Sequence, residues 1–225
     1  MQWISVGSGI EHAEGGGTPQ GEEAHGFQIW VNVPKERKMD DPRYGTISSE
    51  SIPVIKNQRM ESRLLAGTVE SQIGPFETVT PVQIIDVSLA GKGSYRHTVP
   101  ENYDNCLVYV YRGKAAICGA VVSKRSVVRL DASRGHKRTL EIVNVADEET
   151  CFLVFAGVRL NEPIAWHGPF VMNSRAEVIE AILEYQQGTF LKRCAQWDYK
   201  RIASGPSMDK SRKDHTEAIS SQCHK

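Results

Sequence analysis

Short apolar runs recur at regular spacing along most of this 225-residue chain. In one of them Ile85, Val87 and Leu89 alternate with Asp86 and Ser88, which is the pattern of a half-exposed antiparallel strand. The runs are separated by Gly, Pro, Asn, Asp or charged turn residues and cover residues 64–69, 82–89, 106–111, 115–118, 127–130, 140–145 and 151–155. Short strands at this spacing predict a β-sandwich or a small β-barrel.

The beginning of the chain predicts two more strands around a glycine-rich loop. Residues 1–6 form a short apolar run that ends at the turn Gly7-Ser8-Gly9. Residues 27–33 alternate apolar and polar side chains, so they predict a strand with one apolar face, and Pro34 ends it because proline cannot donate to a ladder. The polar residues 35–57 carry turn chemistry and predict an ordered connector between two modules.

One helix is predicted near the carboxyl end. Ser174-Arg175-Ala176-Glu177 has the pattern of a capping box, and Gly188 supplies a stop. The apolar positions between them fall on one helix face, namely Val178, Ala181, Ile182 and Tyr185. A second, shorter helix is expected from residue 190 to about 201, and the polar residues from 204 onward predict a mobile tail.

Charge and cysteine content narrow the classes of function. The 27 basic residues balance 27 acidic ones, so the chain lacks the broad positive field of a protein that binds nucleic-acid phosphates directly. The 5 cysteines show no CxxC spacing, and three lie in apolar runs where a thiol behaves as a small hydrophobe. We expect a soluble intracellular protein without disulfides, membrane span or signal peptide.

Candidate metal chemistry lies beside the first glycine turn. His12 and Glu14 are two residues apart, so in an extended segment both side chains leave the same face and can reach one metal ion. Imidazole nitrogen and carboxylate oxygen suit iron, zinc or manganese. Two donors are half of an ordinary ligand set, and on spacing alone an exposed polar pair without a metal is the commoner alternative.

Other histidines give weaker signals. His97 lies in the outline of a β-barrel metal motif, but Tyr95 and Val99 stand where a companion histidine is required, which favours an exposed or hydrogen-bonded histidine. His136 has the context of a loop residue. His167 is expected to cap or hydrogen-bond the turn into the helix.

Nucleophilic and phosphate-binding chemistry are not indicated. No Ser-His-Asp grouping can be assembled from the spacing of these residues. The run Gly15-Gly16-Gly17 does not lead from a strand into a helix, as a phosphate-binding loop would. Tyr109 and Tyr111 lie in an apolar run and are expected in the core or lining a cavity.

Four segments, in this order, resemble the pirin family of the cupin superfamily. They are Gly9-Ile10-Glu11-His12-Ala13-Glu14, residues 26–34 (Gly-Phe-Gln-Ile-Trp-Val-Asn-Val-Pro), Asp41-Pro42-Arg43-Tyr44, and residues 162–173 (Glu-Pro-Ile-Ala-Trp-His-Gly-Pro-Phe-Val-Met-Asn). The resemblance implies a mainly all-β bicupin, two double-stranded β-helix barrels with short helices near the carboxyl end. It also implies an iron site in the first barrel and a second barrel without metal ligands.

In that family His12 and Glu14 correspond to the later two of four iron ligands. The earlier two belong to a His-Pro-His type segment, which this sequence does not contain. We therefore expect an incomplete first barrel, whose open edges would reduce solubility or promote self-association. The expected domains are residues 1–34 as the remnant of the metal-binding barrel, 35–57 as a connector, 58–203 as the second barrel with its closing helix, and 204–225 as the tail.

The resemblance implies two alternative functions. One is an iron-binding, redox-sensitive transcriptional coregulator that docks on a transcription factor in the cytoplasm or nucleus. The other is a quercetin 2,3-dioxygenase-like enzyme acting on a flavonol, in which Glu14 would also be a general base. Iron is expected to be weakly bound or absent in this chain, with little or no enzymatic activity. Neither direct nucleic-acid binding nor a membrane partner is expected.

Overall fold

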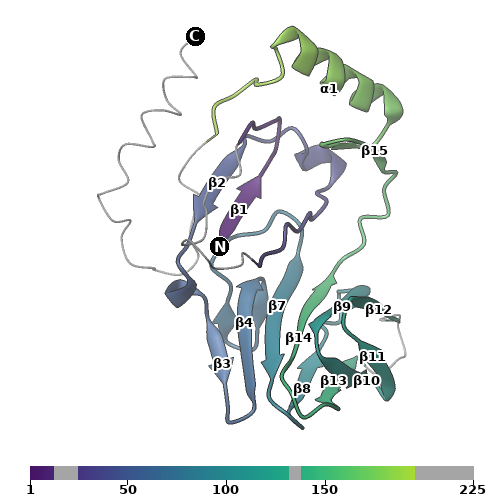
Figure 1. Ribbon diagram of the computed structural model, residues 1–225. Helices are drawn as coiled ribbons and strands as arrows, with labels where there is room; N and C mark the ends of the chain where they lie inside the picture. Colours follow the sequence, from purple (N-terminus) through teal and green to yellow (C-terminus); the bar gives the residue numbers. More distant parts are fainter. Residues whose placement is uncertain (13–24, 132–137, 196–225) are drawn as a thin grey trace. The chain divides into compact units, whose positions relative to one another are not determined.

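The computed structural model describes residues 1–12, 25–131 and 138–195 of the chain (Figure 1). Within them, one compact unit comprises residues 1–3 and 46–159, and another comprises residues 4–45 and 160–195. Strands predominate in this part of the chain, so the all-β fold class is confirmed. The predicted domain limits stay a prediction.

The larger sheet of the first unit is antiparallel, with the strand order β12-β9-β14-β7-β4-β3 (Figure 1). Its strands are β3 (Val54–Lys56), β4 (Met60–Ala66), β7 (Val82–Leu89), β9 (Asn105–Arg112), β12 (Ser126–Asp131) and β14 (Thr150–Gly157). Strand β14 pairs with β7 on one side and β9 on the other, and its register with β9 shifts between Cys151 and Phe152. It therefore joins the two halves of the sheet.

A smaller antiparallel sheet in the same unit has the order β11-β10-β13-β8. Its strands are β8 (Ser94–Thr98), β10 (Lys114–Ile117), β11 (Ala120–Ser123) and β13 (Thr139–Asn144), and a separate hairpin is formed by β5 (Thr68–Val69) and β6 (Gln72–Ile73). Six of the seven apolar runs each lie in one strand of this unit, with ends displaced by a few residues, and the run at 64–69 covers the end of β4, Gly67 and β5. The prediction of short antiparallel strands is confirmed.

The core of the first unit is built from the inward-facing residues of both sheets. As predicted, Ile85, Val87 and Leu89 are buried on one face of β7, while Asp86 and Ser88 are less buried on the other. Further core residues include Val108, Val110, Ala115, Ile117, Leu140, Ile142, Phe152 and Val154. Large apolar side chains therefore fill the interior of the barrel.

Asn144 closes one end of this core with a buried hydrogen-bond cluster. Its Nδ2 donates to the carbonyl oxygens of Glu148 at 2.7 Å and Leu89 at 3.0 Å. Its Oδ1 accepts from the Thr150 hydroxyl at 2.9 Å and from the backbone N–H of Ala146 at 2.9 Å. Both Asn144 and Thr150 are buried, so the cluster uses both ends of the amide where water cannot replace them.

The second unit contains a hairpin and one helix. Strands β15 (Ala165–His167) and β16 (Phe170–Met172) pair, and α1 (Arg175–Gln187) lies against them (Figure 1). The predicted capping box of Ser174 and Glu177 is present, and Gly188 ends the helix in the left-handed conformation at φ 72°. The first helix is thus confirmed, but the second is wrong at residues 190–195, which are irregular. Residues 196–201 and the predicted tail, 204–225, lie outside the described residues.

The segments before residue 57 contain short elements. Strands β1 (Gln2–Ser5) and β2 (Arg43–Thr46) form a two-stranded sheet, and η1 (Lys35–Arg37) and η2 (Ser49–Ser51) are single turns of 3-10 helix. The strand predicted over residues 27–33 is wrong, because residues 25–34 form no strand. A period-two pattern shows only that an extended segment would have an apolar face, whereas a strand also needs a neighbour to complete its ladder. In the described part of the chain, no helix is long and apolar enough to cross a membrane.

Replacement of Asn144 tests the buried hydrogen-bond cluster. Asn144→Asp removes the donor and turns a carboxylate toward carbonyl oxygens, so we expect the free energy of unfolding to fall by about 3 kcal/mol. Urea denaturation followed by circular dichroism measures the change. As a matched control, Asn57→Asp keeps the acceptor that binds the Arg59 N–H at 2.9 Å and should change stability little. Equal effects of the two substitutions would contradict this role of Asn144.

Candidate functional site

The Gly7-Ser8-Gly9 turn is defined by close backbone packing. The Ser8 N–H donates to the carbonyl oxygen of Asp40 at 2.8 Å, and a Cβ on Gly7 would collide with that same oxygen. Gly9 has φ +130°, and a Cβ there would lie 2.8 Å from the Phe190 ring. The turn therefore requires glycine for its conformation and for its fit against these two neighbours.

His12 follows this turn and is exposed. Its predicted companion, Glu14, lies outside the described residues, so the arrangement of the pair stays a prediction. Among the residues that the structure describes, no three His, Cys, Asp or Glu side chains are grouped closely enough to hold a metal ion. The donor types of His12 and Glu14 fit iron, but two donors do not make a complete ligand set.

Sequence reasoning missed a buried lysine in the second unit. Lys38 lies in the polar connector, yet only 7% of its surface is exposed. Its Nζ donates to Asn32 Oδ1 at 2.6 Å and to the Val171 carbonyl oxygen at 3.3 Å. Burial lowers the pKa of Lys38, and the carboxylates of Glu162 and Glu177 partly oppose that shift. The ammonium group thus joins the segment at residues 26–34 to the β15–β16 hairpin.

Two carboxylates extend this polar cluster. Glu162 Oε2 accepts from the Lys35 backbone N–H at 2.9 Å and from Asn173 Nδ2 at 3.0 Å. Glu177 Oε2 accepts from the backbone N–H groups of Ser174 at 2.7 Å and Asn173 at 3.1 Å. Hydrogen bonding from Ser174 lowers the pKa of Glu177. These contacts fix the start of α1 relative to residues 162–173 and η1.

Aromatic packing brings the first signature segment into the same unit. Phe170, Tyr185 and Phe190 meet edge to face, with ring centroids 5.4 to 6.4 Å apart. Phe190 is the ring that approaches Gly9, and Asp41 pairs with Arg193. All four signature segments therefore contribute described residues to the second unit, and several of those residues hold the segments together.

His97 is an inward-facing residue of the first unit. It is buried, and its Nε2 lies 3.0 Å from Gln83 Oε1. Because Gln83 Nε2 donates to the Thr68 carbonyl oxygen, its Oε1 is left to accept, and this hydrogen-bond pattern assigns the proton to His97 Nε2. Burial lowers the pKa of His97. The prediction of a hydrogen-bonded histidine is confirmed, although His97 is not exposed.

The remaining predicted positions are His167, His136 and the two tyrosines of β9. His167 is exposed at the end of β15, and Ser174 rather than His167 caps α1, so the capping role predicted for His167 is wrong. His136 lies outside the described residues. Tyr109 and Tyr111 are both half-buried on the face of β9 opposite Val108 and Val110, so the alternative that places them in the core is wrong.

Two of the three free cysteines in the described residues are buried. Cys106, Cys118 and Cys151 are free, whereas Cys194 is in a disulfide, so the expectation of no disulfide is wrong at that position. Burial raises the pKa of Cys106 to about 11 and also raises that of Cys151. Both are therefore thiols at neutral pH, which makes them poor nucleophiles.

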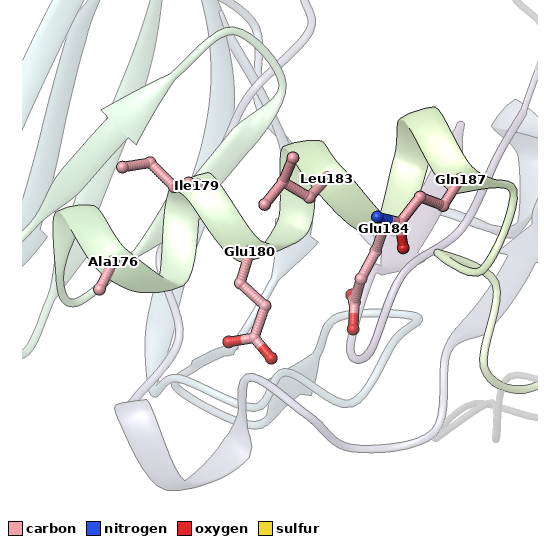
Figure 2. A pocket seen from close by; sticks show the side chains of 6 residues that line it. All are labelled: Ala176, Ile179, Glu180, Leu183, Glu184 and Gln187. Carbon is pink, nitrogen blue, oxygen red and sulfur yellow. The ribbon is translucent and has the colours of Figure 1, made fainter.

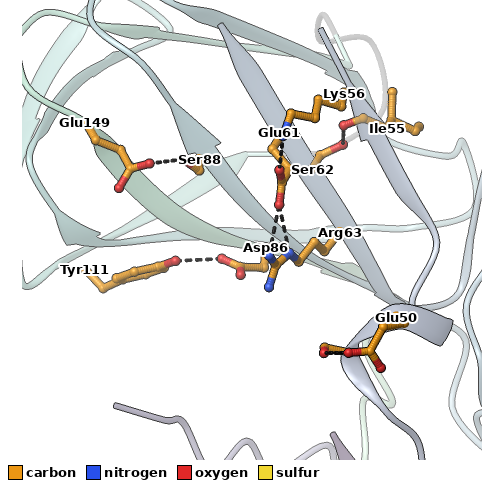
Figure 3. A network of polar contacts seen from close by, with 11 residues as sticks. Glu50, Ile55, Lys56, Glu61, Ser62, Arg63, Asp86, Ser88, Tyr111 and Glu149 are labelled. Atoms are coloured by element: carbon orange, nitrogen blue, oxygen red, sulfur yellow. Dashed lines mark hydrogen bonds and ion pairs between the residues drawn. The ribbon is translucent and has the colours of Figure 1, made fainter. Parts of the chain in front are cut away.

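The outer face of the larger sheet carries a polar network (Figure 3). The Tyr111 hydroxyl donates to Asp86 Oδ1 at 2.8 Å, and the Ser88 hydroxyl donates to Glu149 Oε1 at 2.6 Å. Burial and the adjacent Asp86 carboxylate raise the pKa of Tyr111. The network links neighbouring strands and keeps the tyrosine protonated, so it stabilises the sheet without an activated acid or base.

A shallow groove runs along the outer side of α1 (Figure 2). Ile179 and Leu183 provide its apolar surface, with about half of each side chain exposed. Ala176, Glu180, Glu184 and Gln187 complete the lining. It contains no histidine or cysteine, and Glu184 pairs with Lys192 at 2.9 Å. The groove therefore offers a surface for contact but no grouping for catalysis.

Two antiparallel sheets around an apolar core define a cupin-type barrel in the first unit. Residues 84–191 match the pirin C-terminal cupin domain. The chain is 32% identical to Pirin-1 of Arabidopsis thaliana over 187 residues, 83% of this chain and 64% of that protein. It is 32% identical to a pirin-like protein of Caulobacter vibrioides over 193 residues, 84% of this chain and 67% of that protein. The chain belongs to the pirin family.

A solved structure supports the same assignment. The crystal structure of quercetin 2,3-dioxygenase from Acinetobacter baumannii aligns with a TM-score of 0.66 and 33% identity, covering 72% of this chain and 55% of that one. The chain therefore spans about two thirds of these curated relatives and about half of the solved structure.

Substitution of the turn glycines tests whether the turn is shaped by packing. Gly7→Ala places a Cβ against the Asp40 carbonyl at φ +52°, so we expect it to destabilise the second unit by about 2 kcal/mol. Hydrogen exchange of the amides in β15, β16 and α1 measures the loss. Gly26→Ala, where a Cβ would meet nothing within 4 Å, is the matched control and should be neutral.

His97 should make the stability of the first unit depend on pH. Its folded-state pKa lies below the ordinary value of 6.5, so the unfolded chain binds the proton more readily. The contribution of neutral His97 is fully present above pH 6.5 and is lost as the pH falls, by at most about 1.4 kcal/mol per pH unit. Urea denaturation between about pH 7 and 5 should show a smaller slope for His97→Gln than for the unsubstituted chain. The exposed His167→Gln variant should keep the original slope, and identical slopes in all three proteins would refute the assignment.

Proposed function

We propose that this chain is part of an iron-binding pirin-type cupin protein that acts as a redox-sensitive transcriptional coregulator. In this proposal the protein works by binding a partner protein. Membership of the pirin family and the exposure of His12 support a role in which the protein binds iron and docks on a partner protein. Glu14 is proposed as the second donor that the chain contributes.

The filled interior of the first unit supports recognition at the surface of that unit. Val108, Val154 and Ile142 are fully buried between the two sheets, and the inward-facing His97 is bonded to Gln83. A drug-sized ligand needs a pocket of about 300 Å³ or more. Since side chains occupy this barrel, its exposed surfaces are better suited to recognition than its interior.

The charge balance of the chain supports the proposed kind of partner. The balanced charge of the chain favours a protein partner, such as a transcription factor, over direct contact with nucleic acid. We propose the cytoplasm or the nucleus as the location.

A flavonol dioxygenase is the alternative function. The similarity to the Acinetobacter baumannii quercetin 2,3-dioxygenase, at 33% identity, favours it. In this alternative the substrate would be a flavonol, and Glu14 would serve both as an iron ligand and as a general base. The reaction would need ligands beyond the two that this chain offers.

Metal content tests the proposed contribution of His12. With two of the four donors implied by the family, the chain purified from iron-rich medium should hold well below one iron per chain. Elemental analysis of the purified protein measures this ratio. His12→Ala should remove the residual iron, whereas the exposed His167→Ala should leave it unchanged. A full iron equivalent in the unsubstituted chain would overturn the two-donor argument.

Oxygen uptake with quercetin separates the coregulator from the dioxygenase when it is followed on a longer form that also carries the other two iron ligands. We expect that form, supplemented with iron, to consume oxygen no faster than iron-supplemented buffer, while the Acinetobacter baumannii enzyme serves as the positive control. Turnover that is abolished in its Glu14→Gln variant would instead establish the dioxygenase.

A further inference from the structure

Strand β11 presents an open backbone edge in the first unit. It pairs with β10 on one side and, among the described strands, has no neighbour on the other. The Lys124 N–H donates to the Gly113 carbonyl oxygen at 3.0 Å. Because bonded and non-bonded pairs alternate along an antiparallel ladder, the backbone N–H and C=O groups of Val121 and Ser123 then point toward the open side. Both residues therefore offer a donor and an acceptor to a further strand.

A row of apolar side chains crosses the smaller sheet from this edge. Val121 is 58% exposed, and its cross-strand partner is Ala116 of β10. Ala116 is in turn opposite Val143 of β13, which is 42% exposed. Directly opposed residues share one face of a sheet, so the register makes these three side chains contiguous. A strand added to β11 would continue the row, and a β-branched residue suits that position.

The chain around this edge is strongly basic. The stretch between Asp104 and Asp131 contains no Asp or Glu. Its basic residues are Arg112, Lys114, Lys124, Arg125 and Arg129. Arg112 pairs with Glu149 at 2.9 Å, whereas the others are exposed and form no ion pair among the described residues. In a chain whose charges balance overall, this is a local excess of uncompensated positive charge.

Three of these cations gather at the end of β11. Lys114 is directly opposite Ser123 in the ladder, and Lys124 and Arg125 follow Ser123 in the turn to β12. The Arg125 N–H donates to the Val110 carbonyl oxygen at 2.7 Å, so the backbone of this turn is tied to β9. We call Lys114, Lys124 and Arg125 the basic cluster. Beside an open edge, such a cluster attracts carboxylates on any strand that pairs there.

An acidic peptide strand matches both the edge and the charge. The outward carbonyl oxygens of β11 need donors, which a peptide backbone supplies at every residue and phosphate groups do not. A second copy of the chain would add an identical positive cluster to the same short ladder, so the cluster opposes self-pairing. These two features favour an acidic peptide over a nucleic acid and over a second copy.

We propose that the edge of β11 binds an extended segment of a partner protein in which acidic residues flank a short β-branched stretch. The segment pairs through its backbone with Val121 and Ser123, and its carboxylates lie beside the basic cluster. This proposal depends neither on iron nor on the coregulator role, so its test is separate from the metal and oxygen-uptake measurements.

Fluorescence anisotropy with a labelled peptide, Glu-Asp-Val-Thr-Val-Thr-Asp-Glu, tests the proposal on the intact chain. The acidic pairs at both ends serve either strand direction. We expect saturable binding that weakens as salt rises. N-methylation of the two valines and, in a second peptide, of the two threonines separates strand pairing from charge attraction. One of these peptides should bind about 10-fold more weakly, because its methyl groups block the amides that face β11, while the other should bind as the parent does.

Charge reversal on the chain tests the location. Lys124→Glu and Arg125→Glu should each raise the dissociation constant of the peptide by about 5-fold or more, because each replaces an attraction with a repulsion. Arg175→Glu, at an exposed position of α1 in the second unit, makes the same change of charge and should leave binding unaltered. All three side chains are exposed, so thermal melting should show that each variant remains folded.

Absence of binding, equal affinities of the two methylated peptides, or equal effects of Arg125→Glu and Arg175→Glu would overturn the proposal. So would tighter binding of a single-stranded oligonucleotide than of the peptide, which would assign the edge to nucleic acid. A chain dimer in sedimentation velocity that Lys124→Glu alters would likewise overturn it, since a second copy would then occupy the edge.

Discussion

The alternation of side chains across a β-strand is the constraint on which the first unit depends. Along β14, Phe152 and Val154 point into the barrel, while Cys151 and Leu153 point to the opposite face. A shift of one residue in the pairing with β7 or β9 would exchange these two sets. The correct register therefore fills the interior with apolar side chains, and that filling restricts recognition to the outside of the barrel.

The second unit is organised by a different kind of contact. Lys38 gives up much of its hydration to bond Asn32 and the Val171 carbonyl, and the carboxylates nearby offset part of that cost. The turn glycines allow the backbone to approach Asp40 and Phe190. Several signature residues thus have an architectural role. His12 and Glu14 differ because their side chains are metal donors by type.

Local sequence patterns predicted the strands of the first unit and the helix of the second unit well. The alternation in residues 82–89 and the capping box at Ser174 are signals that neighbouring residues carry by themselves, and both are present. Residues 27–33 have an equally clear alternation but form no strand, because a ladder depends on a neighbour that the pattern does not specify. The burial of Lys38 could not be predicted either. Val171 is distant from it in sequence, and Asn32 has no pattern that marks it as a partner of Lys38. For the candidate metal site, the sequence offers two suitable donor types, His12 and Glu14, but it does not determine their geometry.

We propose that the metal-ligating capacity of the chain lies in the segment containing His12 rather than in the interior of the barrel, where the His97 Nε2 faces Gln83 Oε1. Titration of the 15N-labelled chain with paramagnetic Mn²⁺, followed by nuclear magnetic resonance, tests this assignment most directly. The amide resonances of Gly9 and of the residues beside His12 should broaden first, while those of Tyr95 and His97 keep their widths. Broadening that begins at Tyr95 and His97 would contradict the assignment.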